Sequence, residues 1–399
     1  MTKIDDKRVP ALRFKGFNDD WAQRKLGKLS KIKSGQTPSS HDNSNYYPPQ
    51  INWIRTGDLT NSKIISVDKL LSKKGAEKLT VFPKNTVVIA MYGGFNQIGR
   101  TGLLTFPSTI NQALAAISPN PLINSNFLLQ LLNKNIYTWR RVAASSRKDP
   151  NITKKDIENQ KFDFPSLFEQ EKISKLISLI DKLITLQQRK LKQYQLIKKW
   201  LCSVVFNDTV HDDANILFSN RVKANQLFES ISKKGFKDLP VLSASQEKGM
   251  VFRDDISKNI TYTNSNLNNY KLVSPGNFVV HLRSFQGGFS YSNKIGIASP
   301  AYTIFEFKDN IKYDSIFWKE KFKSYNFIQL LKKVTYGVRD GRSISFSDFL
   351  SLYLAFPDIE IQKKIGKCFK ALDNQISDQQ CIIQQLKQLK QFLLQNMFI

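Results

Sequence analysis

A chain of 399 residues exceeds the size of one compact core and fits two or three domains. Its 60 Lys and Arg residues against 33 Asp and Glu residues give a net charge of +27, which favours a polyanionic partner, nucleic acid ahead of an anionic membrane surface. The basic residues are spread over the whole length, which argues against a disordered cationic tail.

The cysteines and histidines indicate neither a disulfide framework nor a metal site. Cys202, Cys368 and Cys381 are odd in number and widely spaced, and the three histidines lack the spacing of metal ligands. Residues 1–8 have no apolar core of a secretion signal, and no run approaches the roughly twenty apolar residues of a membrane helix. We expect a cytoplasmic protein with no metal site and no segment that crosses a membrane.

Residues 1–163 predict a first domain of mixed α/β type. Residues 51–55 alternate like a strand, residues 86–91 form a continuous apolar run typical of a buried strand, and residues 126–133 have helical periodicity. The run at residues 86–91 leads into a glycine pair, and another buried strand, predicted at residues 278–282, leads into a second pair. The chain therefore carries two related domains.

A long stretch, residues 164–206, recurs as residues 356–398 at an offset of 192 residues without a gap, and roughly a third of the aligned positions are identical. Both copies predict a long helix that begins just after a proline. The predicted order is a first domain (1–163), a central helix (164–206), a linker (207–215), a second domain (216–355) and a distal helix (356–399).

Each long helix has an apolar stripe at steps of three or four residues, typical of a coiled-coil seam. The first stripe is Ile173, Ile177, Ile180, Ile184, Gln187, Leu191, Tyr194, Ile197, Leu201 and Val205. The second is Ile365, Phe369, Leu372, Ile376, Gln379, Ile383, Leu386, Leu389, Leu393 and Met397. Because the stripes match in length and phase, we expect the helices to pair antiparallel about a pseudo-twofold axis.

Each stripe contains one glutamine near its midpoint, Gln187 or Gln379. In an antiparallel pair these two amides would meet and fix the register. The alternative is that both amides point to solvent at the edge of the seam.

A repeated scaffold that carries two dissimilar domains suits a reader of two different half-sites. A helix of about 38 residues at roughly 1.5 Å per residue is on the order of 55 Å long. That length corresponds to roughly 15 base pairs, so the spacing suits a split DNA site.

Two stretches superficially resemble catalytic motifs. Residues 94–101 nearly match a phosphate-binding loop, but they have Arg100 where lysine is needed, and no helix is predicted after them. Residues 357–363 suggest a nuclease metal site, but acids at the start of a helix explain them better. The chain also lacks the sequence motif of amino-group methylation, so we predict no catalytic residues and no metal ligands.

The function that remains is contact with nucleic acid through the protein surface. Arg and Lys can neutralise phosphates, and Arg, Gln and Asn can pair with base edges. The candidate DNA-binding residues in turn or loop segments are Gln36, Arg55, Tyr92, Arg100, Arg147 and Lys148 in the first domain, and Arg283, Gln286, Arg339 and Arg342 in the second. For each charged residue simple solvation is the alternative. For Tyr92 the alternative is packing.

The order of several short motifs resembles the specificity subunit of type I restriction-modification systems. They include residues 34–38 (Ser-Gly-Gln-Thr-Pro), residues 54–58 (Ile-Arg-Thr-Gly-Asp), residues 91–94 (Met-Tyr-Gly-Gly) and Asn111-Gln112. At the head of each long helix, Phe-Pro is followed by Gln-x-Lys-Ile. No single motif is specific, but their order together with the 192-residue repeat is.

This resemblance implies an α/β (α+β) fold with two target-recognition domains separated by a pair of long antiparallel helices, each domain reading half of a bipartite double-stranded DNA site. It also implies two adenine methyltransferase (M) subunits docked on this chain and restriction/translocase (R) subunits in the complete enzyme. S-adenosylmethionine, ATP and Mg²⁺ would be bound by those partners and none by this chain.

Three alternatives stay open at this point. The chain could serve a methylation-only or type IIB-like system, or it could be a self-contained nuclease or methyltransferase, which predicts that the chain alone modifies DNA. An adaptor that binds RNA or membranes would show little preference for one duplex DNA sequence.

Overall fold

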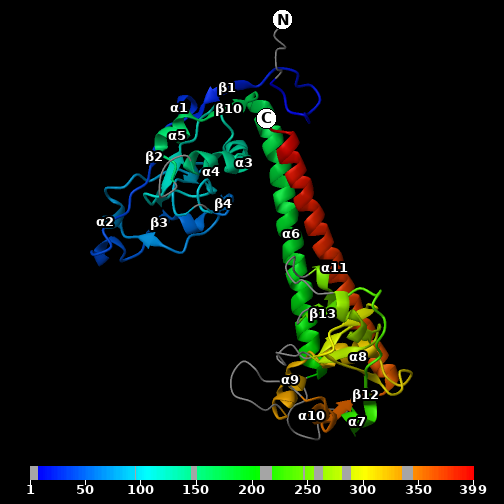
Figure 1. Ribbon diagram of the computed structural model, residues 1–399. Helices are drawn as coiled ribbons and strands as arrows, with labels where there is room; N and C mark the ends of the chain where they lie inside the picture. Colours follow the sequence, from blue (N-terminus) through cyan, green and yellow to red (C-terminus); the bar gives the residue numbers. More distant parts are fainter. Residues whose placement is uncertain are drawn as a thin grey trace, which may run out of the picture. The chain divides into compact units, whose positions relative to one another are not determined.

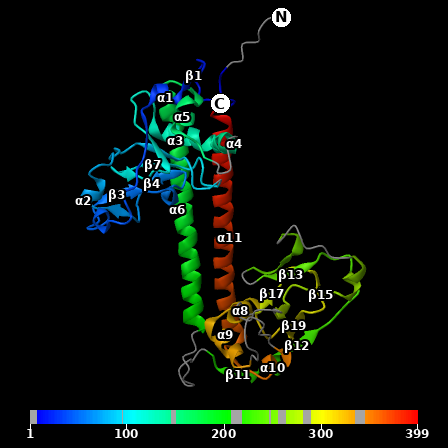
Figure 2. The same ribbon diagram turned by 60° about the vertical axis from the view of Figure 1, so that its left-hand side comes forward.

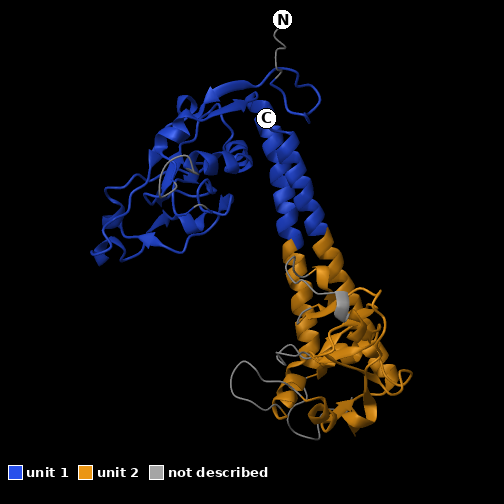
Figure 3. Cartoon of the chain, viewed as in Figure 1, with its two compact units in different colours: residues 1–187, 382–399 blue, residues 188–381 orange. Residues whose placement is uncertain are grey.

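The computed structural model describes residues 8–94, 96–144, 151–206, 218–245, 248–255, 264–280, 289–334 and 345–399. The chain divides into two compact units, coloured blue and orange in Figure 3. Unit 1 comprises residues 1–187 and 382–399, and unit 2 comprises residues 188–381. Each unit therefore joins one domain to one end of each long helix. In the described ranges no helix carries an apolar stretch long enough to cross a membrane.

The first domain, residues 22–164, lies in unit 1 and mixes helices with sheets (Figure 1). Its described helices are α1 (Leu26–Leu29), α2 (Lys73–Ala76), α3 (Ser125–Lys134), α4 (Ile136–Ala144) and α5 (Lys154–Asn159), with 3-10 turns η1 (Asn43–Asn45) and η2 (Thr56–Asp58). Its described strands are β1 (Ala22–Lys25), β2 (Ile32–Ser34), β3 (Ile51–Ile54), β4 (Ser62–Ile64), β5 (Leu70–Leu71), β6 (Val87–Ala90), β7 (Thr101–Leu104), β8 (Thr109–Ile110), β9 (Leu114–Ile117) and β10 (Lys161–Phe164). The predicted strands at residues 51–55 and 86–91 and the helix at residues 126–133 are confirmed.

The second domain, residues 220–356, lies in unit 2. Its described helices are α7 (Ala224–Leu227), α8 (Ser315–Lys321), α9 (Tyr325–Lys332) and α10 (Phe346–Leu350), with 3-10 turns η3 (Arg253–Asp255) and η4 (Asn264–Asn269). Its described strands are β11 (Asn220–Lys223), β12 (Phe228–Ile231), β13 (Leu242–Ser245), β14 (Gly249–Phe252), β15 (Lys271–Val273), β16 (Phe278–Val280), β17 (Ser290–Tyr291), β18 (Gly296–Ala298), β19 (Thr303–Phe307) and β20 (Tyr353–Phe356). The strand predicted at residues 278–282 is confirmed over β16.

Four strands follow the same order in the main sheets of the two domains. In the first domain the order is β2-β9-β6-β7-β4, and in the second it is β12-β19-β16-β17. Each domain also closes on a short antiparallel pair, β1 with β10 or β11 with β20, and the second strand of each pair leads into a long helix. The domains thus share a sheet plan even though their central sequences have diverged.

The long helices are α6 (Leu167–Phe206) and α11 (Ile359–Asn396), which lie side by side in both Figure 1 and Figure 2. In unit 1 the first turns of α6 pack on the last turns of α11, and Ile177 and Ile180 share a core with Leu393 and Met397. In unit 2 the last turns of α6 pack on the first turns of α11, where the rings of Phe206 and Phe369 stack at 5.9 Å. The helices are therefore antiparallel in each unit, as the fold class predicted.

The predicted helix-pairing residues are all buried or half-buried. Those that are buried are Ile173, Ile177, Ile180, Ile184, Phe369, Gln379 and Ile383, and those that are half-buried are Gln187, Leu191, Ile365, Leu372 and Ile376. The burial of Gln379 excludes the alternative in which both glutamines point to solvent. Since Gln187 belongs to unit 1 and Gln379 to unit 2, the proposed meeting of the two amides stays a prediction.

The prediction of a buried seam position is wrong for two residues of the stripes. Ile197 and Leu389, which occupy equivalent places in the repeat, are 47% and 45% exposed. The neighbouring Lys198 and Lys390 are half-buried instead, because each ammonium group reaches an aspartate of the other helix while the aliphatic stem covers the seam. Spacing therefore predicts an apolar residue at the seam where the helix instead turns the next lysine toward its partner.

A buried glutamine ties each long helix to its domain. In unit 1, Gln170 Oε1 accepts a hydrogen bond from the backbone N–H of Asn124 (3.0 Å), the residue that caps α3. In unit 2, Gln362 Oε1 accepts one from the backbone N–H of Asp314 (3.1 Å), which caps α8. Both glutamines are 1% exposed and lie 192 residues apart, so the same joint is built twice.

The repeat also duplicates a charge pair between the helices. Lys390 Nζ lies 2.7 Å from Asp181 Oδ1 in unit 1, and Lys198 Nζ lies 2.6 Å from Asp373 Oδ1 in unit 2. Only the second pair is extended among the described residues: Lys319 also contacts Asp373, at 2.5 Å. Burial alone would raise the pKa of Asp373, but the hydrogen bonds from the two lysines outweigh it and lower that pKa.

Replacing Asp373 with asparagine is expected to lower the free energy of unfolding by about 1 to 3 kcal/mol, since two half-buried ammonium groups lose one of their two carboxylate partners and keep only Glu320. The matched change Asp181→Asn should cost at most about 1 kcal/mol, because that pair is single and more exposed. Urea unfolding of the whole chain measures both.

Lowering the pH should reduce the difference in unfolding free energy between the wild type and Asp373→Asn. The pKa of Asp373 is lowered in the folded chain, so its contribution is complete above the unfolded aspartate pKa of about 3.9 and is lost as the pH falls through the lower folded pKa. A difference between wild type and Asp373→Asn that stayed constant from about pH 7 to about pH 2.5 would contradict this assignment.

Candidate nucleic-acid interface

One end of the main sheet in unit 1 collects the loops that carry the predicted contact residues. β2 and β6 both run antiparallel to β9, so the residues that follow β2 and β6 lie beside those that precede β9. β7 runs antiparallel to β6, which brings the residue before β7 to the same end. Gln36, Tyr92 and Arg100 therefore share one end of the sheet with Gln112.

Arg55 joins this end through a second sheet. β3 runs parallel to β8, and Asn111, the residue after β8, donates its backbone N–H to the carbonyl of Ile54 (2.9 Å). Arg55 follows Ile54 directly, and its backbone N–H donates to Asp58 Oδ2 (2.7 Å), which closes a 3-10 turn. The four predicted contact residues of the first domain that the structure describes thus converge.

The segment after β2 passes very close to the segment after β8. A Cβ atom on Gly35 would lie 2.2 Å from the carbonyl oxygen of Asn111 and 2.3 Å from that of Ile110, so only glycine fits there. The backbone N–H of Gln36 then donates to the Ile110 carbonyl (3.0 Å). These close approaches fix where Gln36 and the exposed Thr37 leave the sheet.

The turn after β6 positions Tyr92. Gly93 and Gly94 have backbone φ values of +120° and +94°, which residues other than glycine rarely adopt, so the turn requires the glycine pair. The Tyr92 hydroxyl donates to the backbone carbonyl of Gln112 (2.6 Å). Burial raises the pKa of the Tyr92 phenol, so it remains a donor at neutral pH.

Several polar atoms at this end are buried without a hydrogen-bond partner among the described residues. They are Arg55 Nε, Gln97 Oε1 and Asn111 Oδ1. Since buried polar groups in folded proteins are normally paired, such atoms mark places where a partner or a rearrangement is expected.

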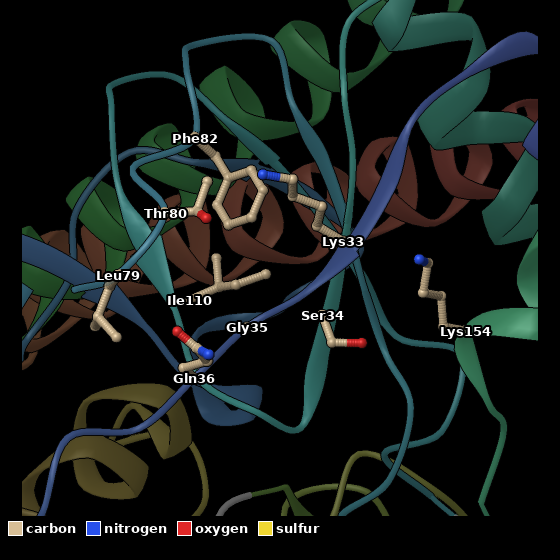
Figure 4. Close-up of a pocket in the computed structure, with 9 residues that line it drawn as sticks. All are labelled: Lys33, Ser34, Gly35, Gln36, Leu79, Thr80, Phe82, Ile110 and Lys154. Atoms are coloured by element: carbon tan, nitrogen blue, oxygen red, sulfur yellow. The ribbon is translucent and has the colours of Figure 1, made fainter.

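A hollow of about 370 Å³ opens beside these loops (Figure 4). Its apolar lining is Leu79, Phe82 and Ile110, and its polar lining includes Lys33 from β2 and Lys154 from α5. Gln36 also lines the hollow, which links it to the loops at the end of the sheet. Two lysines at an open hollow can neutralise phosphates that run past it.

The described residues contain no cluster of metal-ligating side chains. No group of three or more His, Cys, Asp and Glu side chains there could hold a metal ion. The segment that resembles a phosphate-binding loop leads into strand β7, as expected, and not into a helix. Burial, with a smaller effect of Glu320, raises the pKa of the Cys202 thiol to about 11, so this cysteine stays protonated and unreactive.

The other six predicted DNA-binding residues lie outside the described residues. They are Arg147, Lys148, Arg283, Gln286, Arg339 and Arg342. In unit 2 the corresponding sheet end carries Lys233 and Tyr302, and Lys271 Nζ donates to the Tyr302 carbonyl (2.8 Å). Burial first, and then Lys234, lower the pKa of Lys271.

The sequence profile of the family described as type I restriction modification DNA specificity domain matches residues 18–195 and residues 219–388. These two matches cover most of the chain and fall one on each half of the repeat. The chain belongs to this family.

Individual relatives agree with the family match. The type I restriction enzyme MjaIX specificity subunit of Methanocaldococcus jannaschii is 26% identical over 186 residues, which make up 45% of this chain and 41% of that protein. The aligned part therefore spans less than half of that relative.

Two solved structures share the fold. The S subunit of a type I restriction-modification system from M. genitalium has a TM-score of 0.62 at 16% identity, and the match covers 98% of this chain and 99% of that chain. A chain from work on complex assembly and conformational transition of the type I R-M system has a TM-score of 0.54 at 15% identity, covering 94% of this chain and 96% of that one.

Sequence reasoning did not single out Lys33, Thr37, Gln112 and Lys154 as site residues. Thr37 and Gln112 stand within motifs that were noted, and each lies a few residues from a buried strand. The signal that could have found them is this position at a strand end, combined with the antiparallel register that brings the strand ends together.

Replacing Lys33 and Lys154 together with alanine is expected to weaken binding to every duplex DNA sequence alike. The slope of log affinity against log salt should become shallower by roughly 0.9 for each phosphate that the variant no longer neutralises. Anisotropy titrations at several salt concentrations measure both quantities.

The control is the pair Lys175→Ala and Lys182→Ala, which removes the same charge from exposed positions of α6 in the same unit. An equal decrease in affinity for both double variants would mean that net charge matters and the hollow does not.

Proposed function

We propose that this chain is the DNA-reading subunit of a type I restriction-modification complex. One observation carries the proposal: the same order of four strands and the same buried glutamine joint are built twice in one chain, while the loops at the sheet ends differ. A duplicated scaffold with unlike loops suits the recognition of two unlike half-sites.

Charge and geometry support DNA as the ligand. The net charge of +27 favours a polyanion, and the lysines of the hollow in unit 1 lie beside amide, phenol and guanidinium groups that can reach base edges. The long helices would set the distance between the half-sites, because a helix of 40 residues rises about 1.5 Å per residue.

In this proposal the chain itself catalyses nothing. Two adenine methyltransferase subunits dock on it and modify the site that it selects, and restriction/translocase subunits complete the enzyme. S-adenosylmethionine, ATP and Mg²⁺ are bound by those partners. The duplicated scaffold supports two equivalent docking places for the methyltransferase.

Mapping methylated adenines across the host genome, with and without this chain, tests the proposal. We expect methylation at one bipartite sequence that disappears when the chain is deleted and returns when it is supplied again. Methylation that persists without the chain, or DNA cleavage by the purified chain alone, would overturn it.

The outer faces of the long helices offer a place for those partners. Trp200 in unit 2 and Phe392 in unit 1 are equivalent in the repeat, and they are 63% and 52% exposed. Each lies one turn from the exposed Ile197 or Leu389. Exposed aromatic residues of this kind are typical anchors of protein interfaces.

The two places are not equally apolar. Leu196 and Val204, beside Trp200, are 55% and 56% exposed, whereas the equivalent residues beside Phe392 are Gln388 and Asn396. Trp200→Ala is therefore expected to weaken methyltransferase binding more than Phe392→Ala does, by roughly tenfold or more at its own site.

Native mass spectrometry of the chain titrated with the methyltransferase measures both stoichiometry and affinity. Ile65→Ala, which removes an isolated exposed apolar side chain of the first domain, is the control. Full binding of two methyltransferase copies to the double variant Trp200→Ala, Phe392→Ala would refute this docking surface.

A further inference from the structure

Gln112 is held from two sides, once at its exposed side chain and once at its backbone carbonyl. The Thr37 hydroxyl Oγ1 hydrogen bonds to Gln112 Oε1. The Tyr92 hydroxyl donates to the backbone carbonyl of Gln112 (2.6 Å). Thr37 comes from the segment after β2 and Tyr92 from the turn after β6, so two separate loops converge on one residue.

The backbone around Gln112 is also fixed. The N–H of Leu114 donates to the carbonyl of Asn111 (3.1 Å), which closes a turn over Gln112, and the N–H of Met91 donates to the carbonyl of Ala113 (2.8 Å). An exposed glutamine usually loses side-chain freedom when it binds a ligand. A glutamine that is already held loses less, which is the advantage of a preorganised contact.

The chemistry of a held amide points to one ligand. A glutamine pairs with adenine in the major groove by donating from Nε2 to N7 and by accepting at Oε1 from the N6 amino group. The hydroxyl of Thr37 occupies one lone pair of Oε1, and an amide oxygen has two. The second lone pair can therefore accept from adenine N6.

We propose that Gln112 reads an adenine in the half-site bound by the first domain, and that Thr37 and Tyr92 are positioning residues that orient it. This inference rests on the proposed function as a DNA-reading subunit. It adds the residue that specifies one base pair and the two hydroxyl groups that hold it in place.

The equivalent turn of the second domain, which lies within the described residues, has no glutamine in the place of Gln112. That turn is closed by the N–H of Tyr302 donating to the carbonyl of Ser299 (3.0 Å), and Pro300 stands where the first domain has Gln112. Proline has no side-chain donor or acceptor. A change at Gln112 should therefore alter only one of the two half-sites.

The test uses the assembled methyltransferase complex with wild-type chain or the variant Gln112→Ala, and it maps the methylated sequences. We expect the variant to lose roughly 5- to 150-fold of its preference for adenine at one position of one half-site. Preference at the other positions should not change. Gln23→Ala, at an exposed glutamine of β1, is the control.

The positioning residues have their own readout. Tyr92→Phe removes a hydroxyl group and Thr37→Val replaces one with a methyl group, and both should relax preference at the same position as Gln112→Ala does. Thr37→Ser restores the hydroxyl group and should restore the preference. A merely structural role would lower stability or overall affinity without singling out that position.

Base analogues identify the atom that Gln112 reads. Once the half-site is known, 7-deazaadenine is placed at each of its adenines in turn. Removing the N7 acceptor should weaken wild-type binding at one position and leave Gln112→Ala unaffected there.

The outcomes separate this inference from the proposed function. A wild-type complex that methylates no specific site defeats the proposed function. A Gln112→Ala complex that methylates with unchanged preference at every position, or with an equal decrease at all of them, overturns the role of Gln112 alone.

Discussion

The structure depends on a buried glutamine at the start of each long helix. The side chain of Gln170 or Gln362 donates to the carbonyl of the proline just before its own helix and accepts from the backbone N–H of the residue that caps a helix of the adjoining domain. Removing such an amide would leave buried backbone groups unpaired, which costs more than the hydrogen bond itself contributes. The glutamine therefore fixes how each domain meets its helix, and aromatic stacking of Phe127 on Phe398 and packing of Phe317 on Phe206 complete the joint.

Because this joint is buried and repeated, the opposite end of each sheet is free to vary. The strand order β2-β9-β6-β7 has its counterpart in β12-β19-β16-β17, but the turn that holds Gln112 in one domain holds Pro300 in the other. Variation at a strand end changes which groups are presented and leaves the core intact. The same physical separation lets one scaffold carry readers of different sequences.

Much of the scaffold could be predicted from the sequence, because periodicity and the 192-residue offset report burial directly. Ile177, Ile180 and Phe369 were recognised as seam residues by spacing alone. Ile197 and Leu389 were not placed correctly, because spacing cannot tell whether an apolar side chain or the stem of the next lysine faces the partner helix. That choice depends on Asp373 and Asp181, which lie on the opposite helix and are distant in the sequence.

The candidate site was less accessible to sequence reasoning for the same reason. Gln36, Arg55 and Tyr92 could be placed in loops, but their meeting at one sheet end follows from strand register. Gln112 becomes a candidate reader only when Thr37 and Tyr92 are seen to hold it. Two kinds of group serve two purposes at this end of the sheet. The attraction of the lysines at the hollow to phosphate depends on salt and not on sequence. The hydrogen bonds of the held Gln112 amide depend on the base. Affinity and specificity can then change independently, because the lysines and the amide make their interactions with different parts of the duplex.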